Sequence, residues 1–385
     1  MNFYKTIRKK GVLLLSCAIL LCGCNRPSNP QGSVLPENSL PQGTEQRNES
    51  SSYDSNIQVI VEDDTEAPAP GMVRSRLTNE WVEEDVANTR PIAVMIPNES
   101  GALPHYNLSE ASVVYEANVE GRITRLMAIF EDWQDLVRIG NIRSARTYYA
   151  YWAFEWDAFL VHFGGPYYIN ELMSLEETEN IDGLSGNSTA FYRSKDRLDP
   201  HNVYTDGKLL LKQIQKNKYP LEYRGLSDES HFQFATKAKP NALDQYGKDA
   251  QNAIYIDMSG CYPLTRCYFE FNEDNGLYYR FQHLSGRSDG PHTDAGGTQL
   301  AFKNILVQYT KQETLDEKGY LVLQCHDDTR DGWFFTNGKG IHVNWKKDSD
   351  YGATRYYDDN GKEISLNTGK TMICIVNEND SFTFR

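Results

Sequence analysis

The residues with the clearest chemical potential are two arginines three positions apart, at a predicted transition from strand to helix. In residues 140–146 a short apolar strand ends at Gly140, and a helix is predicted to begin near Ser144. The amides at a helix N-terminus carry a partial positive charge and attract anions. Arg143 and Arg146 would project from one side of this turn and hold a phosphate or a carboxylate. The alternative is that both arginines pair with carboxylates of the chain and only stabilise the fold.

Two glutamates and two further arginines lie on the neighbouring predicted strands. The strand predicted over residues 112–120 alternates so that Glu116 and Glu120 share a face. Arg125 lies in the next predicted strand, and Arg122 lies at the turn before it. Because charged side chains in apolar strands are costly to bury alone, these residues either form structural ion pairs or line a cleft. We expect both arginines to contribute to the anion site, with Glu116 or Glu120 as a candidate acid or base.

Two histidines and two asparagines complete the predicted cleft. His162 lies at the end of a predicted strand, and His201 follows an Asp-Pro pair. Either histidine could act as an acid, a base or a ligand contact, or could be purely structural. Asn98, which follows a predicted strand, and Asn202 are expected to line the same cleft. The sequence contains no HExxH, GxSxG, GxGxxG or Walker A motif, and no metal or cofactor is predicted.

The N-terminus predicts export and lipid attachment. Residues 5–10 carry four basic side chains, residues 11–21 are uncharged and apolar, and residues 21–24 read Leu-Cys-Gly-Cys. This order is typical of a bacterial lipoprotein signal peptide, residues 1–23, that is removed before Cys24. We expect Cys24 to carry diacylglycerol and palmitate and to hold the chain on the extracytoplasmic face of the cell membrane; an ordinary signal peptide is the alternative. The polar residues 24–71 predict a disordered tether.

The charge balance limits the partners. The chain has 39 basic and 53 acidic residues, a net charge of −14. Cleavage before Cys24 removes four basic residues, so that 35 basic and 53 acidic residues leave a net charge of −18. Such a chain repels nucleic acid, which we exclude as a general partner. The expected partners are the lipid bilayer, through Cys24, and a cell-wall component or an envelope protein.

The predicted elements change in character along the chain. Residues 90–235 mix predicted strands (92–96, 112–120, 123–130, 136–139, 157–163) with predicted helices (144–156, 168–177, 208–216). From residue 251 onward, short strands alternate with Asn-Gly and Asp-Asn turns. We therefore predict an α/β N-terminal domain over residues 72–235 and a mainly β C-terminal domain over residues 251–385, joined by a hinge.

The C-terminal region adds four cysteines and one polar loop. The cysteines are Cys261, Cys267, Cys325 and Cys374, and outside the cell they are either disulfide-bonded or buried thiols. The loop over residues 290–297 contains His292 and could hold a metal or cover a cleft. We expect instead a turn with local hydrogen bonds.

Eight short motifs together resemble the YerB-like lipoproteins of Gram-positive bacteria. The motifs are spread over most of the chain after the tether and lie at residues 90–96, 111–117, 120–125, 127–130, 142–146, 162–165, 200–204 and 367–371. The resemblance implies an α/β domain followed by a β-rich domain and a location in the cell envelope, but it implies no reaction. One departure is Asn141, where the loop of the family more often reads Gly-Pro-Val-Arg.

Two functions are compatible with these observations. The first is a non-catalytic envelope factor that binds a cell-wall fragment, an anionic polymer or a partner protein. The second is a membrane-anchored phosphotransferase or hydrolase that acts on a phosphorylated or carboxylated envelope substrate, with Arg143 and Arg146 on the anion. We prefer the first function because the sequence shows no complete set of nucleophile and base.

Overall fold

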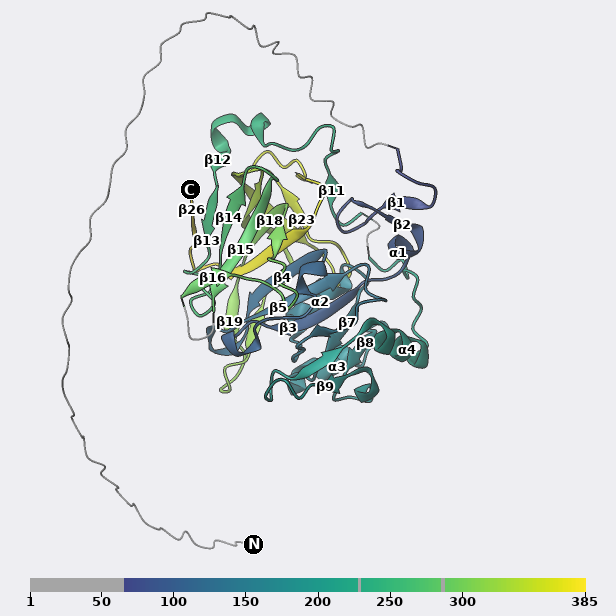
Figure 1. Cartoon of the computed structure of the whole chain (residues 1–385). Coiled ribbons are helices and arrows are strands. Elements are labelled where there is room, and N and C mark those ends of the chain that lie inside the picture. The colour runs from purple at the N-terminus through teal and green to yellow at the C-terminus, as the bar shows by residue number, and fades with distance from the viewer. Residues whose placement is uncertain (1–65, 228–229, 285–287) are drawn as a thin grey trace, which may run out of the picture. The chain divides into compact units, whose positions relative to one another are not determined.

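The main feature of the fold is one large sheet to which both halves of the chain contribute strands (Figure 1). The computed structural model describes residues 66–227, 230–284 and 288–385. The N-terminal half contributes β3 (Ile92–Pro97), β4 (Val113–Asn118), β5 (Thr124–Phe130), β7 (Phe159–His162) and β8 (Asn180–Asp182). The C-terminal half contributes β12 (Gln251–Asn252), β18 (Asn304–Thr310), β21 (Asp327–Thr336), β22 (Lys339–Lys347), β23 (Arg355–Tyr357) and β25 (Thr371–Asn377).

The two halves of this sheet meet at β25 and β4. These strands pair in parallel, with Met372 opposite Val114 and Cys374 opposite Glu116, and β18 pairs in parallel with the other edge of β25. Every residue of β4 is buried, as are all residues of β25 before Asn377. Strands covered on both faces read as continuous apolar runs, which explains their composition. The sheet therefore contains strands from both sides of the predicted hinge between residues 235 and 251. The domain limits that we place there remain a prediction.

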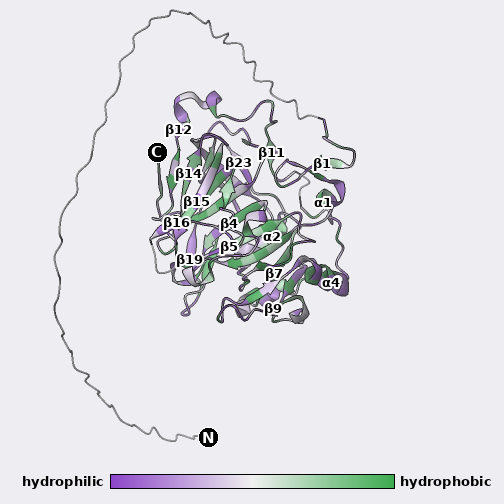
Figure 2. Cartoon of the chain, viewed as in Figure 1, coloured by the Kyte–Doolittle hydropathy of each residue, from purple (hydrophilic) through white to green (hydrophobic). Residues whose placement is uncertain are grey.

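Two apolar cores cover the two faces of the sheet. Ile92 and Val94 belong to one core, which also contains Phe269 of a second sheet. That sheet consists of β13 (Tyr255–Asp257), β14 (Tyr268–Asn272), β15 (Leu277–His283), β16 (Asp289–Pro291), β17 (Ala301–Phe302) and β26 (Thr383–Phe384). Met95 belongs to the other core, which it shares with Trp152 of helix α2 (Thr147–Phe154). Figure 2 shows the hydrophobic residues concentrated in β4, β5, β7 and α2.

Short elements complete the fold. Small sheets are formed by β1 (Met72–Arg74) with β2 (Trp81–Glu83), by β6 (Ile139–Gly140), β10 (Val203–Thr205) and β9 (Tyr192–Arg193), by β11 (Gln233–Phe234) with β24 (Ser365–Leu366), and by β19 (Gln312–Thr314) with β20 (Leu321–Leu323). The other α-helices are α1 (Glu84–Asn88), α3 (Asn170–Met173) and α4 (Gly207–Asn217). Turns of 3₁₀-helix lie at Ser100–Ala102, Leu108–Glu110, Glu120–Arg122, Tyr167–Ile169, Ser188–Ala190 and Asp244–Asp249.

The described chain is mostly β-sheet with few helices, so the α/β description of the N-terminal domain is not confirmed. The predicted helix over residues 144–156 is shorter, because its start is held in extended conformation up to Arg146. The helix predicted over residues 168–177 contains only the four residues of α3. Helix α4 agrees with its prediction, since the side chain of Asp206 accepts a hydrogen bond from the amide of Leu209 at 2.8 Å and caps its start.

Several predictions concern residues that the structure does not describe. The signal peptide over residues 1–23, the lipid-bearing Cys24 and residues 24–65 of the tether lie outside the described ranges. Residues 66–71 are described, and they are exposed and form no helix or strand. Within the described ranges no helix combines the length and the apolar composition that a membrane span requires. The four cysteines of the C-terminal region are buried free thiols, so a disulfide between Cys261 and Cys267 is not formed.

Candidate functional site

The segment that we predict to bind anions passes the carboxyl ends of β3 and β7. The amide of Arg143 donates a hydrogen bond to the carbonyl of Met95 at 2.9 Å, and the amide of Phe163 donates to the carbonyl of Arg143 at 3.0 Å. Helix α2 follows directly, with Arg146 as its extended N-cap residue and no capping side chain. Ligands of open sheets commonly bind at such strand ends. The backbone therefore fixes both arginines at a position that suits a binding site.

Three arginines gather here, and we call Arg125, Arg143 and Arg146 the arginine cluster. Nε of Arg146 donates to Oε1 of Glu120 at 2.8 Å, and the two side chains form an ion pair. Arg125 is only 5% exposed; its guanidinium donates to the carbonyl of Ser144, and its Nε has no partner among the described residues. Within the described ranges neither Arg125 nor Arg143 forms an ion pair with a carboxylate. The cluster therefore keeps an excess of positive charge.

The pKa values show that these charges act on one another. Burial, followed by the nearby charges of Arg146 and Arg143, lowers the pKa of Arg125 to about 10. Burial also opposes the charge of Glu120, but the hydrogen bond and the charge of Arg146 outweigh it and lower the pKa of this carboxyl. One carboxylate thus neutralises one of three neighbouring guanidinium groups, and the remaining two lack a counter-ion from the described chain.

His201 lies close to Arg143, the third member of the arginine cluster. Nη1 of Arg143 lies 3.4 Å from the carbonyl of Pro200, and Nε2 of His201 lies 3.8 Å from Oε1 of Glu99. Burial lowers the pKa of His201; Glu99 opposes this change, whereas Arg143 and Arg197 reinforce it. The imidazole is therefore mainly neutral near pH 7. Its Nδ1 is buried and has no hydrogen-bond partner among the described residues.

Glu116 lies away from the arginine cluster. Its fully buried carboxylate pairs with Arg280, with 2.7 Å between Oε2 and Nη2, and Oε1 accepts hydrogen bonds from Asn98 at 2.9 Å and Thr124 at 2.7 Å. Burial opposes the charge of Arg280, but Glu116 outweighs burial and raises the pKa of Arg280. We predicted that Glu116 and Glu120 share a face. Strand β4 instead ends at Asn118, and Glu120 lies in a 3₁₀-turn from which it reaches Arg146.

Two further predicted site residues are engaged elsewhere. The half-exposed side chain of Arg122 pairs with Asp380, with 3.1 Å between Nη2 and Oδ2, so it points away from the arginine cluster. Asn202 accepts a hydrogen bond from Nη1 of Arg193 through Oδ1 at 2.6 Å. The structure therefore brings together Arg125, Arg143 and Arg146 of the four predicted arginines.

His162 lines a different cavity. Its Nδ1 lies 2.9 Å from the carbonyl of Gly164, and its Nε2 lies 3.2 Å from Oδ1 of Asn180. The ring is buried at the wall of a polar cavity of about 370 Å³. Both ring nitrogens thus face oxygen atoms of the protein, which gives this histidine a structural environment.

A buried chain of hydrogen bonds that the sequence does not predict joins the two halves. Arg280 donates to Nδ1 of His292, whose Nε2 lies 3.2 Å from Nδ1 of His105, and Nε2 of His105 donates to the carbonyl of Pro97 at 2.7 Å. Burial lowers the pKa of both histidines, that of His105 to about 3. The turn expected around residues 290–297 does form, with Asp294 accepting from its own loop. No local pattern could reveal that His292 contacts a histidine 187 positions away.

The fold and these contacts describe a mostly β protein whose two halves share a sheet. Two family models match the chain: "Protein of unknown function (DUF3048) N-terminal domain" at residues 77–220 and the corresponding C-terminal domain at residues 258–373. The "Putative lipoprotein YerB" of Bacillus subtilis (strain 168) is 27% identical over 311 residues, which are 80% of this chain and 88% of the relative. The crystal structure of YerB protein from Bacillus subtilis has a similar fold, with a TM-score of 0.68 and 24% identity over 81% of this chain and 99% of that chain. The chain belongs to the YerB-like family.

Proposed function

We propose that this protein is a lipid-anchored envelope protein that binds an anionic ligand at the arginine cluster. Two observations support the anchor: the Leu-Cys-Gly-Cys sequence at residues 21–24, and the lipoprotein name of the Bacillus subtilis relative. Cys24 would carry the diacylglycerol and hold the protein on the extracytoplasmic face. The partners are then the bilayer and a cell-wall component or an envelope protein with phosphate or carboxylate groups.

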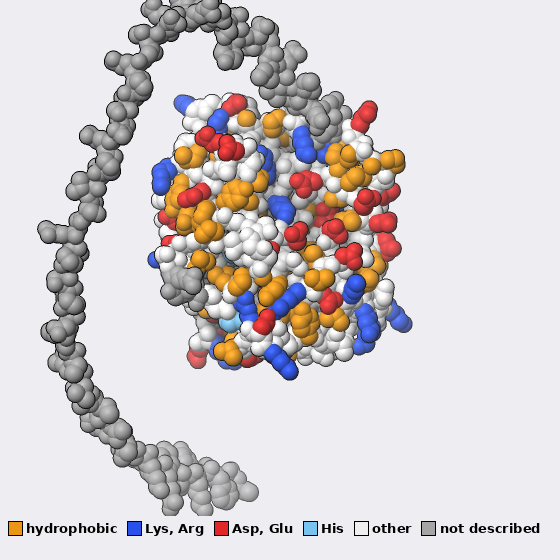
Figure 3. Space-filling view, viewed as in Figure 1, with side chains coloured by type: hydrophobic (Ala, Val, Ile, Leu, Met, Phe, Trp, Pro, Cys, Tyr) orange, Lys and Arg blue, Asp and Glu red, His pale blue; other side chains and the backbone are white. Residues whose placement is uncertain are grey.

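The observation that carries this proposal is the charge of Arg125, which has no carboxylate partner among the described residues. A buried charge without a counter-ion is costly, and the mature chain has 53 acidic residues that could have neutralised it. A bound phosphate or carboxylate would accept hydrogen bonds from the partly exposed guanidinium of Arg143 and would lie close to the charge of Arg125. The uncapped start of α2 adds a favourable field. Figure 3 shows acidic and basic side chains interspersed over one face of the molecule, so a binding preference for anions would come from local clusters.

Binding is better supported than catalysis. Glu116 and Glu120, the two predicted acids or bases, are each engaged by an arginine. The alternative of a phosphotransferase or hydrolase rests on His201, whose neutral ring lies beside Arg143 with a free ring nitrogen among the described residues. This single group would supply proton transfer but no nucleophile.

The test is a titration of the mature protein with poly(glycerol phosphate) and with polygalacturonate, which carry phosphate and carboxylate groups. We expect Arg143→Gln to weaken binding of the preferred polymer about tenfold or more, because each hydrogen bond to a charged group contributes about 1.5–3 kcal/mol. The melting temperature of this variant should stay close to that of the unchanged protein, because Arg143 has no carboxylate partner to lose among the described residues.

The matched control is Arg266→Gln. Arg266 is half-exposed and pairs with Asp289 at the surface, with 2.6 Å between Nη2 and Oδ1, so its loss removes the same charge outside the arginine cluster. If both substitutions weaken polymer binding equally, the effect is explained by the loss of net charge alone, and the proposed site is refuted. The proposal is also refuted if neither of the two polymers binds.

A further inference from the structure

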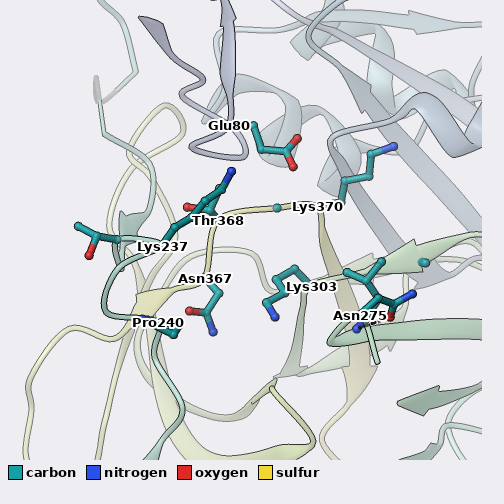
Figure 4. Close-up of a pocket in the computed structure, with 12 residues that line it drawn as sticks. Glu80, Lys237, Pro240, Asn275, Lys303, Asn367, Thr368 and Lys370 are labelled. Atoms are coloured by element: carbon teal, nitrogen blue, oxygen red, sulfur yellow. Dashed lines mark hydrogen bonds between the residues drawn. The ribbon is translucent and has the colours of Figure 1, made fainter. Parts of the chain in front are cut away.

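A second positively charged site lies apart from the arginine cluster, in a pocket of about 450 Å³. Three lysines, Lys237, Lys303 and Lys370, line this pocket together with Glu80 and Thr368, and we call it the lysine pocket (Figure 4). Figure 4 shows the three lysines on different sides of the pocket. None of its lining residues belongs to the arginine cluster.

The walls of the lysine pocket are built from distant segments that hydrogen bonds fix in place. The amide of Gly369 donates to the carbonyl of Thr78 at 2.8 Å, and the side chain of Asn79 donates to the hydroxyl of Thr368 at 2.8 Å. The amide of Lys303 donates to the carbonyl of Lys370 at 2.9 Å. These contacts attach the loop between β24 and β25 to its neighbours on both sides. The pocket is therefore pre-formed, which lowers the entropic cost of binding.

Lys303 provides the strongest evidence for an anion. Its Nζ donates to the carbonyl of Gly276 at 3.1 Å and to Oδ1 of Asn337 at 2.8 Å, both neutral groups. Burial lowers the pKa of Lys303, and no carboxylate among the described residues offsets this change. An ammonium group has three N–H donors, so one remains for a ligand.

Lys370 adds a second partly buried ammonium group. Its Nζ donates to the carbonyl of Ser109, and burial lowers its pKa although Glu110, Glu80 and Asp294 act in the opposite direction. Glu80 contributes the single carboxylate among the lining residues. Lys303 differs from Lys370 in that no carboxylate of the described residues acts on its ammonium group, although the chain has a strongly negative net charge.

We propose that the lysine pocket binds a small organic anion, namely a phosphate or carboxylate on a hydroxylated carbon skeleton. Ammonium groups recognise both anions. The hydroxyl of Thr368 can exchange hydrogen bonds with ligand hydroxyls, while Pro240, Leu277 and Ala301 offer apolar surface to a carbon skeleton. The volume of about 450 Å³ lies within the usual range of small-molecule sites, roughly 300–1,000 Å³.

The first experiment is a calorimetric titration of the mature protein with glucose 6-phosphate, glucuronate, inorganic phosphate and neutral glucose. We expect one of the two sugar anions to bind, phosphate to bind more weakly and glucose not to bind. Lys303→Gln should weaken the preferred sugar anion about tenfold or more. Lys339→Gln, at a half-exposed lysine that pairs with Asp244 outside the pocket, should leave binding unchanged, and so should Arg143→Gln. Binding of neither sugar anion, or binding of glucose as tight as that of the anions, would overturn the proposal.

The second experiment needs no substitution and therefore remains decisive if Lys303→Gln fails to fold. Acetylation of lysines in the unchanged protein is followed by mass spectrometry with and without the sugar anion. Protection of Lys303 with unchanged labelling of Lys339 supports the proposal. Equal labelling of Lys303 in both samples at a saturating concentration would overturn it, whereas the arginine cluster would be unaffected by either result.

Discussion

Glu131 offers the sharpest test of the electrostatics of this fold. Its side chain is 4% exposed, and Oε2 accepts a hydrogen bond from the hydroxyl of Ser75 at 2.6 Å, while Oε1 has no partner among the described residues. Burial raises the pKa of Glu131 from 4.5 to about 7, and the charges of Asp132 and Glu80 act in the same direction. The substitution Glu131→Gln keeps a hydrogen-bond acceptor for Ser75 and removes the titration.

The expected magnitude follows from the pKa shift. Between pH 4.5 and 7 the unfolded chain releases the proton of Glu131 while the folded chain retains it, so the free energy of unfolding falls as the pH rises through this window. A shift from 4.5 to about 7 corresponds to about 3 kcal/mol at about 1.4 kcal/mol for each pH unit. Above pH 7 both states are ionised, and the loss is complete. Glu131→Gln should therefore be more favourable, relative to the unchanged protein, at pH 8 than at pH 4.5.

Urea unfolding of both proteins across this pH range measures the effect. The difference between their free energies of unfolding should change by about 3 kcal/mol between pH 4.5 and pH 8, in favour of the glutamine variant at high pH. Any constant cost of the substitution cancels in this comparison. A difference that does not depend on pH would refute the assignment of a buried, protonated Glu131.

Three other predictions test separate parts of the molecule. Glu116→Gln leaves the buried Arg280 without its counter-ion, so urea unfolding should show a loss of about 3–5 kcal/mol. Burial lowers the pKa of His105 from 6.5 to about 3. As the pH falls from 6.5 to about 3, the unfolded chain binds a proton at this histidine and the folded chain does not. The free energy of unfolding should therefore fall in this pH range, and it should fall less steeply in His105→Gln. Cys24→Ser should prevent lipid attachment, so that fractionation of cells finds the protein unprocessed or released; cleaved protein retained on the membrane would contradict this.

The local parts of the fold could be predicted from the sequence, and the long-range parts could not. The apolar runs of β3, β4 and β5 indicate buried strands, and Asp206 indicates the start of α4. The parallel pairing of β4 with β25 joins residues more than 250 positions apart, and no periodicity encodes it. The predicted helix was too long at both ends; at its start, hydrogen bonds from Arg143 to Met95 and from Ala145 to Gly164 hold the chain extended, and no local pattern encodes these contacts.

The candidate site shows the same division. Arg143 and Arg146 both lie near Arg125 because the extended segment that leads into α2 runs along the carboxyl ends of β3 and β7, and not because they share a helical turn. The partner of Arg146 could be anticipated as a nearby glutamate, and it is Glu120. Glu116 was expected beside them, but its partner is Arg280, which lies 164 positions later in the second sheet. The lysine pocket has no local signature, since its lining comes from five separate stretches of the chain.

The contrast between paired and unpaired cations is the strongest reason to look for anionic ligands. Arg280, Lys347 and Arg90 are fully buried, and each forms an ion pair with a buried or nearly buried carboxylate. Arg125 and Lys303 have only neutral oxygen partners among the described residues, although the chain carries a net charge of −14. A chain so rich in carboxylates has many ways to neutralise a buried cation. Cations left without a counter-ion under these conditions are best explained by ligands that bring the negative charge with them.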